Sequence, residues 1–298
     1  SNKTNLDPKI AISTTRTVGS RITNRLRAIA TESKTSMFNL LITIYSIFLS
    51  RHINDNRISI GTPITGRTNE KLNNLIGFFV DLLVYPFDID EERTLNSALQ
   101  ATNDLSRDLL KHSDVPFDQI VKHVAPDRDD LGQPLFQAMI VHEISSHAGG
   151  SDTTRSTHTY SSSDHANYDY LLLVRESNDS LEITHHVRAS VFAPAVLQAM
   201  THRFNTLLSR LGRQPNKRIA DISMLPAREF NRVALNWNNT GRQNPYKSNT
   251  LVSRFLQLEK EDPYSPCIID DEATWTRNDI VKLTKYYISI LHKQDTST

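Results

Sequence analysis

The strongest constraint on the fold is one long apolar segment, FNLLITIYSIFL, at residues 38–49. Thr35 or Ser36 can cap its start, and the segment therefore predicts a helix. Apolar side chains lie nearly all round this helix, whereas an ordinary surface helix has one polar face. We therefore expect the helix to be buried on more than one side. A chain of 298 residues is long enough to build the layers that would cover it.

Strands and helices alternate on both sides of this segment. We expect strands at residues 9–15, 57–60, within 75–87, at 135–141, 168–175 and 181–187. Helices are expected over 18–29, after the cap Thr94, after Pro116, and from Pro194 to a stop at Gly212. Residues 144–168 are dense in Ser, Thr, His, Asp and Gly and predict a long loop. The interleaving predicts an α/β fold with a mixed sheet on which the helices pack.

Apolar spacing also predicts which side chains point into the core. The last long helix is expected to bury Val196, Met200, Phe204, Leu207, Leu208 and Leu211. The short helix after Pro116 is expected to bury Phe117, Ile120, Val121 and Val124. The single cysteine, Cys267, lies in an apolar run that predicts a buried strand and an inert thiol.

Charge and composition exclude several classes of function. Lys and Arg total 34 against 33 Asp and Glu, which gives no electrostatic footprint for nucleic acid or an anionic membrane. One cysteine cannot form an internal disulfide, and no apolar stretch approaches the ~20 residues of a membrane span. The chain opens on polar SNKT rather than on Met, which indicates a fragment without a signal peptide. We expect a cytoplasmic location.

The composition changes after residue 212. Residues 213–217 and 236–247 are polar and rich in turn formers, which is typical of a domain boundary. We therefore expect a first domain over residues 1–212, a linker over 213–247, and a small α/β segment over 248–298.

No complete catalytic constellation follows from the residues alone. The pair His185-His186 lies in an alternating strand, so its two imidazoles are expected on opposite faces and cannot converge on one proton. His142, His147, His158 and His165 lack the tight spacing of a zinc site. A phosphate-binding glycine loop and a G-x-S-x-G nucleophile turn are both missing.

Five short motifs carry more information. They are RISIGTPITGR at 57–67, LIGFFVDL at 75–82, DVPFD at 114–118, RDDLGQPLFQ at 128–137, and the closing strand and helix at 181–211. In type, order and spacing they resemble the condensation domains of nonribosomal peptide synthetases, over roughly residues 10–225. WNNT at 237–240, the apolar residues 251–256 and WTRNDI at 275–280 resemble the entry to an adenylation domain.

The resemblance implies a fold and an activity. The fold would be the C-terminal lobe of a chloramphenicol-acetyltransferase-like domain. The parent enzyme would form an amide bond between aminoacyl or peptidyl thioesters tethered to carrier proteins. The tether, 4'-phosphopantetheine, would arrive on those carriers, with no cofactor bound directly and no metal. The partners implied are the N-terminal lobe, the carrier proteins and the downstream adenylation domain, with no nucleic acid and no membrane.

The family's catalytic motif, His-His-x-x-x-Asp-Gly, is not the pair seen here. Ser190 and Val191 stand where the motif requires Asp and Gly. The resemblance therefore implies that the catalytic histidines lie upstream of Ser1. We expect the chain to be inactive in isolation.

The resemblance also implies roles for particular residues. The substrate tunnel or the surface between the lobes would include Arg67, Gly77, Phe79, Asp81 and Gln137. The structural positions of the motifs would be Gly61, Pro63, Gly66, Pro116, Phe117, Arg128 and Pro134. Arg67 would pair with a carboxylate between the lobes. Asp81 replaces the family's Asn, so a group that donates and accepts becomes an anion that only accepts.

Two other functions remain open. The lobe and its linker could form a non-catalytic platform on which carriers and the adenylation domain dock. A stand-alone acyltransferase of the chloramphenicol-acetyltransferase type is the other alternative. The WNNT segment argues against it, because stand-alone enzymes of that type end at the closing helix.

Overall fold

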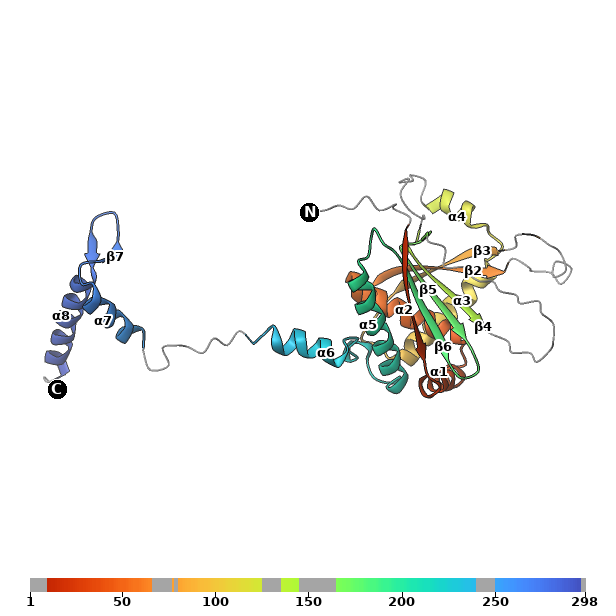
Figure 1. Cartoon of the computed structure of the whole chain (residues 1–298), viewed down its shortest axis with the longest axis horizontal. Helices are drawn as coiled ribbons and strands as arrows, with labels where there is room; N and C mark the ends of the chain where they lie inside the picture. The colour runs from red at the N-terminus through yellow and green to blue at the C-terminus, as the bar shows by residue number, and fades with distance from the viewer. Residues whose placement is uncertain are drawn as a thin grey trace. The chain divides into compact units, whose positions relative to one another are not determined.

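The computed structural model describes residues 10–65, 77, 80–124, 135–144, 165–239 and 250–295. The chain divides into two compact units, Ser1–Asn231 and Arg232–Thr298. Figure 1 labels most of the helices and strands.

The first unit is built on one six-stranded mixed sheet (Figure 1). Its strands are β1 (Ala11–Val18), β2 (Arg57–Thr65), β3 (Val80–Asp88), β4 (Ala138–Ile144), β5 (Tyr170–Glu176) and β6 (Leu181–Arg188). Across the sheet they follow the order β1-β6-β5-β4-β2-β3. The pairs β2–β4 and β4–β5 are parallel and the other pairs are antiparallel. The predicted mixed α/β architecture is confirmed.

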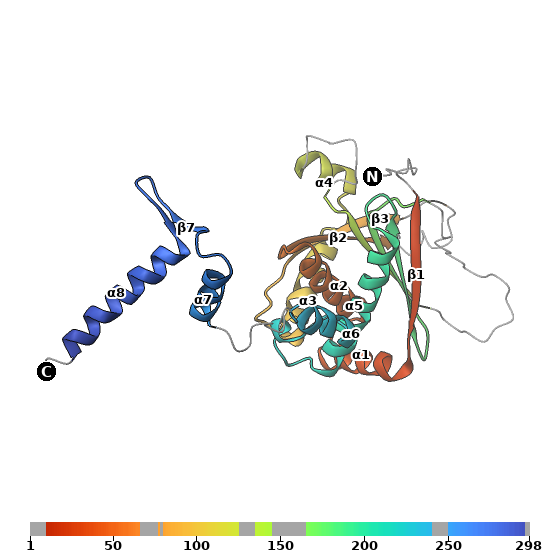
Figure 2. The ribbon, with the colours of Figure 1, turned by 60° about the vertical axis from the view of Figure 1, so that its left-hand side comes forward.

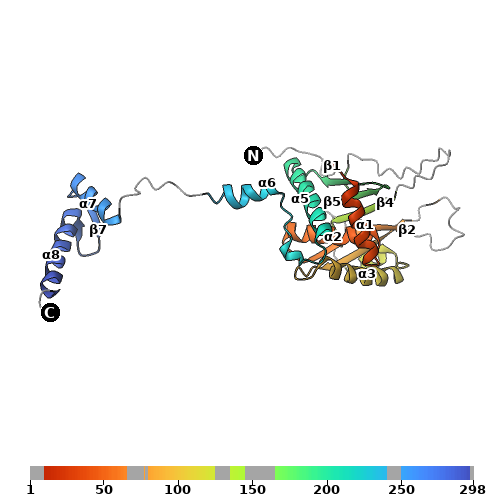
Figure 3. The same ribbon diagram turned by 90° about the horizontal axis from the view of Figure 1, so that it is seen from below.

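Four helices cover one face of this sheet (Figures 2 and 3). They are α1 (Ser20–Glu32), α2 (Met37–Ile53), α3 (Leu95–Lys111) and α5 (Pro194–Arg213). A short helix, α4 (Phe117–Val124), contributes Phe117 to a second, smaller apolar cluster described below. The main core therefore lies between one sheet face and the four long helices.

Helix α2 is the buried helix that the sequence predicts. Ser36 caps it by accepting a hydrogen bond from the backbone N–H of Asn39 at 3.0 Å. Every residue from Leu40 to Ser50 is buried. Asn54 follows the last helical residue, Ile53, and caps the helix; its φ of 55° is the left-handed conformation that Asn tolerates.

Two predictions about helix faces and one about a helix end are wrong. Val196 is 46% exposed because it lies in the first turn of α5, where a surface pocket opens. Val124 is 66% exposed because α4 is short and buries only Val121. Gly212 lies inside α5 rather than after it, since the helix runs on to Arg213. A Cβ there would lie 3.2 Å from Leu26 Cδ2, so glycine lets α1 pack closely.

The chain returns to the core after α5. Ile219 and Ile222 are both buried in the main cluster. Arg51, near the end of α2, donates hydrogen bonds to the carbonyl oxygens of both residues and forms an ion pair with Glu91 at 2.6 Å. Residues 219–222, which the sequence assigns to a linker, are thus packed onto the first unit.

The second unit has very little core. Its elements are most of a short π-helix, η3 (Asn231–Asn236), then α7 (Leu251–Glu261), the hairpin of β7 (Pro266–Ile269) and β8 (Thr274–Thr276), and α8 (Arg277–Asp295). Among its described residues only Val281 is buried. The predicted burial of Cys267 is wrong, because every residue of β7 is exposed and no other described element covers that strand. None of the described helices in either unit is long and apolar enough to cross a membrane.

Candidate functional site

Three of the sequence motifs meet on the sheet face that the four helices leave uncovered. Gly61 lies in β2, Phe136 immediately precedes β4, and Phe117 begins α4. A Cβ on Gly61 would lie 2.2 Å from Phe136 Cε2, so only glycine admits the phenyl ring over the strand. The rings of Phe117 and Phe136 meet edge to face with their centroids 5.9 Å apart. The motif residues thus form one packed unit.

Strand alternation explains why this cluster is separate from the main core. Ile140 and Leu172 point toward the helices, so their neighbours Met139 and Leu171 point to the opposite face. Tyr168 completes the cluster by stacking on Phe136, with ring centroids 5.6 Å apart. Sequence reasoning did not single out Tyr168, since it belongs to no motif and lies where the expected loop meets the next expected strand.

A pocket of about 500 Å³ opens at the ends where β2, β4 and β5 begin. The C-terminal turn of α2 and the first turn of α5 complete its walls. The predicted tunnel residue Gln137 lines it, together with Leu49, His52, Ile53, Arg57, Ile58, Ser59, Leu135, Ala138, Asp169, Tyr170, Val191, Phe192, Val196 and Met200. Most of this lining is apolar, so the pocket suits an apolar group with a few polar contacts.

The polar groups of this pocket are held in place by neighbours. Asp169 pairs with Arg188 at 3.0 Å, and its backbone N–H donates to the carbonyl of Gln137 at 3.1 Å. His52 Nδ1 lies 2.8 Å from the Phe48 carbonyl, and its Nε2 lies 3.4 Å from Arg203 Nη1. Burial lowers the pKa of His52 against the opposing effect of that carbonyl. His52 is therefore neutral at pH 7, with Nδ1 donating and Nε2 accepting.

The two described polar tunnel candidates lie at opposite ends of the sheet. Asp81 pairs with Ile64 near the end of β2, and its carboxylate accepts from the Leu82 backbone N–H at 2.8 Å. Gln137 precedes Ala138, which is in register with Ile60. The offset of about five residues along β2 corresponds to about 16 Å. Asp81 and Gln137 therefore do not contact one common small group.

The other predicted positions divide into described and undescribed residues. Gly77 is exposed. Pro63 is half-buried in β2 opposite Leu82, and Pro116 accepts the first backbone hydrogen bond of α4, from Gln119 at 2.9 Å. The remaining ones, Gly66, Arg67, Phe79, Arg128 and Pro134, lie outside the described residues.

The predicted divergence of His185 and His186 is confirmed. His185 is fully buried on the helix-covered face between Tyr170 and Phe204, with ring centroids 5.9 and 5.3 Å away. Its Nδ1 shares a hydrogen bond with the Tyr170 hydroxyl, and its Nε2 has no partner among the described residues. Burial lowers the pKa of His185 to about 3. His186 faces the other side, and the pair serves no common proton.

Another histidine, His142 of β4, is held by the carboxylate of Glu176, the last residue of β5. His142 Nε2 lies 3.0 Å from Glu176 Oε2, and Arg27 Nε lies 2.9 Å from Glu176 Oε1. Both oxygens of Glu176 are thus engaged, and burial lowers the pKa of His142 despite the carboxylate. Within the described ranges, no three His, Cys, Asp or Glu side chains gather as metal ligands would.

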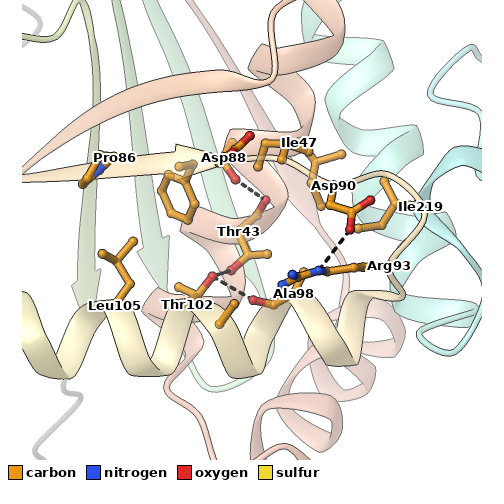
Figure 4. A pocket seen from close by; sticks show the side chains of 14 residues that line it. Thr43, Ile47, Pro86, Asp88, Asp90, Arg93, Ala98, Thr102, Leu105 and Ile219 are labelled. Atoms are coloured by element: carbon orange, nitrogen blue, oxygen red, sulfur yellow. Dashed lines mark hydrogen bonds and ion pairs between the residues drawn. The ribbon is translucent and has the colours of Figure 1, made fainter.

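Figure 4 shows a smaller hollow of about 190 Å³ between α2, α3 and β3. Its hydroxyls bond to one another and to nearby backbone. Thr43 and Thr102 share a hydrogen bond of 2.8 Å, and Thr102 donates to the Ala98 carbonyl at 3.1 Å. Arg93 at the rim pairs with Asp90 at 3.2 Å. The hollow is a packing gap between helices, and no predicted site residue lines it.

Solved structures share this fold. A four-domain nonribosomal peptide synthetase, solved with AMP and glycine, superposes with a TM-score of 0.70 at 20% identity, over 91% of this chain and 22% of that chain. The condensation domain of a monacolin K polyketide synthase superposes with a TM-score of 0.62 at 20% identity, over 73% of this chain and 51% of that one. The architecture is therefore that of condensation domains.

Sequence comparison gives the family. A profile of the condensation domain family matches residues 5–233, and the chain belongs to this family. Tyrocidine synthase 2 of Brevibacillus parabrevis is 24% identical over 273 residues, which is 90% of this chain and 8% of that protein. Chondramide synthase cmdD of Chondromyces crocatus is 26% identical over 254 residues, or 84% of this chain and 6% of that protein. The chain thus spans less than a tenth of the length of these relatives.

The close approach at Gly61 generates a first prediction. Gly61→Ala forces a methyl group into the Phe136 ring and should destabilise the protein by about 1–3 kcal/mol through overpacking. Thermal unfolding followed by circular dichroism measures the change. The double variant Gly61→Ala, Phe136→Leu should lose less than the sum of the two single variants. Gly19→Ala is the matched control, since no atom lies within 4 Å of a Cβ there. Strictly additive losses in the double variant would contradict the contact between residue 61 and the Phe136 ring.

The burial of His185 generates a second prediction, in pH. The unfolded state protonates this histidine near pH 6.5 and the folded state near pH 3, so the unfolded state binds more protons between these values. Its contribution to stability is complete above pH 6.5 and is lost at about 1.4 kcal/mol per pH unit as the pH falls toward 3.

The glutamine variant isolates this effect, since glutamine does not titrate. Urea unfolding from pH 4 to pH 8 should show a smaller loss of stability in acid for His185→Gln than for the natural chain. His186→Gln, at the half-buried neighbour, should change the pH dependence less. Parallel pH profiles for His185→Gln and the natural chain would contradict a buried neutral His185.

Proposed function

We propose that this chain is the C-terminal lobe of a condensation domain, followed by the first part of an adenylation domain. Two facts together carry the proposal. The condensation domain family matches residues 5–233, and this chain corresponds to only part of a whole condensation domain. The superposed regions cover 51% of one solved condensation domain and 54% of an X-domain from teicoplanin biosynthesis, about half of each. The meeting of three family motifs around Phe136 supports the same assignment.

The reaction would be aminolysis of a thioester. The amine of an acceptor held on one carrier protein attacks the donor carbonyl held on another. A C–N bond forms, the C–S bond breaks, and the amine proton passes to a base while the thiolate leaves. Both reactants are tethered by phosphopantetheine, so catalysis is mainly positioning together with one histidine from the upstream lobe.

This chain would contribute one wall of the substrate tunnel and part of the surface between the lobes. Asp81, held by the Leu82 backbone N–H, would face the tunnel. Arg67 would pair with a carboxylate of the upstream lobe, which fixes the two lobes against each other. Gln137, at the other end of the sheet, would line the pocket of about 500 Å³ that receives an apolar part of a reactant or a partner.

The second unit is consistent with an incomplete domain. Large apolar side chains are exposed on both of its helices and on its hairpin: Leu251 by 92%, Ile269 by 73% and Tyr286 by 61%. A soluble domain rarely leaves so much apolar surface uncovered. In this proposal, further residues of an adenylation domain cover these side chains.

A non-catalytic docking platform is the second candidate. It is favoured by one observation: His185 and His186 lie on opposite faces of the sheet, and burial lowers the pKa of His185 to about 3, so this pair does not act on one proton. In that case carrier proteins would bind the chain without any chemistry following, whatever lobe precedes it.

Turnover distinguishes the two candidates. The 298-residue chain, mixed with one aminoacyl-loaded donor carrier and one loaded acceptor carrier, should form no dipeptidyl product by mass spectrometry. A longer form of the parent protein that adds about 200 upstream residues, the size of one lobe, should form it. Product from the short chain would contradict the lobe assignment. Carrier binding with no product from the longer form would favour the docking platform.

Asp81 gives a finer prediction within the longer form. Asp81→Asn keeps an oxygen for the Leu82 N–H and restores a donor where the carboxylate has none. If Asp81 faces the tunnel, this change should shift kcat/KM for condensation by about 3- to 10-fold, or about 1 kcal/mol, while the melting temperature stays within a few degrees. Asp88→Asn, at the opposite end of β3, is the matched control. Equal effects of both substitutions would contradict the placement of Asp81 at the substrate.

A further inference from the structure

A hollow of about 310 Å³ lies on the surface between α1 and α5. It is lined by Arg21, Ile22, Arg25, Ser209, Gly212 and Arg213. Gly212 opens the space, because it brings no side chain between the helices. Arg25 is fixed beside it, since its Nε donates to the Gly212 carbonyl at 3.2 Å.

The arginines of this hollow lack the acidic partners that four other arginines of the first unit have. Arg27, Arg51, Arg188 and Arg203 each form an ion pair with a carboxylate, at Glu176, Glu91, Asp169 and Glu229 respectively. In the part of the chain that the structure describes, Arg21, Arg25 and Arg213 form no such pair. The local sequence explains this: α5 has no Asp or Glu in 20 residues, and the only acid of α1 is its last residue, Glu32.

A polar face of α5 continues from this hollow toward β1. His202, Thr206, Ser209 and Arg213 recur at intervals of four, three and four, so they share one face of the helix. This face is about 16 Å long. At its far end Arg16 of β1 lies against His202, with Nη2 and Nε2 3.3 Å apart. We call this surface the α1–α5 groove; it comprises Arg16, Arg21, Ile22, Arg25, His202, Thr206, Ser209, Gly212 and Arg213.

We propose that the α1–α5 groove binds an acidic segment of a partner protein. Guanidinium groups held near each other without counter-charge repel, and carboxylates of a partner relieve that repulsion while pairing with their donors. A face about 16 Å long matches three turns of an acidic helix and exceeds a single phosphate. Ile22 adds an apolar contact. The chain carries a net charge of only +1, so a polyanionic nucleic acid finds no wider basic surface.

The interaction is independent of the proposed amide-forming activity, and its test needs no turnover. The probe is a fluorescein-labelled peptide of about 16 residues, long enough for a helix of that span, with Glu at every fourth position. Its control is the same peptide with Gln. Fluorescence anisotropy at ~50 mM salt, with the full 298-residue chain, should show saturable binding of the Glu peptide only. Binding should weaken as salt rises, because exposed charges are screened.

Charge reversal locates the site. R21E/R25E/R213E should weaken the Glu peptide at least ~10-fold, since three attractive contacts become repulsive. R21E/R213E, which keeps the Arg25 contact with the Gly212 carbonyl, should lose ~3-fold or more and serves if the triple variant fails to fold. The control R107E/R228E/R254E has the same net charge on residues elsewhere and should change binding less than ~2-fold.

Four results would overturn the proposal. The first is equal binding of the Glu and Gln peptides, and the second is an equal loss of affinity in the groove and control variants. The third is tighter binding of a single-stranded DNA of about 16 nucleotides than of the Glu peptide. The fourth is full displacement of the peptide by ~10 mM inorganic phosphate. The third would mean nucleic-acid binding and the fourth a small-anion site. If the longer form makes no condensation product but the Glu peptide still binds, that result would count against the proposed amide-forming function and not against the peptide-binding groove.

Discussion

Burial of α2 is the constraint on which the rest of the first unit depends. Its buried residues contact three other elements at once. Tyr45 meets Tyr170 of β5 and Phe204 of α5 edge to face, with ring centroids 5.4 and 6.3 Å apart. Thr43 bonds to Thr102 of α3 at 2.8 Å, which satisfies a hydroxyl that would otherwise be buried unpaired. Every neighbouring element must present an apolar surface to this helix, so the order of the layers follows from it.

The two faces of the sheet have different roles. On the helix side, side chains such as Ile60, Ile140 and Leu172 fill the main core. On the other side, the family motifs bring Gly61, Phe117 and Phe136 together from distant parts of the chain. Since alternate residues of a strand serve opposite faces, the same strands carry stability on one side and the motifs on the other.

The architecture could be predicted because the signals for it are long and redundant. The run from Leu40 to Ser50 admits no surface helix, and the alternation of β6 placed His185 and His186 on opposite faces correctly. Predictions failed at element ends. Val196 and Val124 have the right spacing, but the first turn of α5 and the last turn of α4 extend past the surface they pack on. Cys267 failed for another reason, since an apolar run is buried only if a second layer exists to cover it.

The candidate site was harder to predict, because it depends on register and on approach between distant segments. The motifs identify Gly61 and Phe117, yet nothing in a motif says that a phenyl ring from residue 136 lies on Gly61. The separation of Asp81 from Gln137 likewise depends on the pairings Ile64 with Asp81 and Ile60 with Ala138, which no local pattern contains.

His185 shows how a fold overrides a motif. The pair His185-His186 matches the start of a catalytic motif. The strand, however, places the His185 imidazole in the core between Tyr170 and Phe204, where burial keeps it neutral. A histidine that must cycle through its charged form cannot work there. The groups that take part in chemistry must lie where water or a substrate compensates their charge. In the first unit, that condition is met at the pocket and at the uncovered side of the sheet rather than beneath the helices.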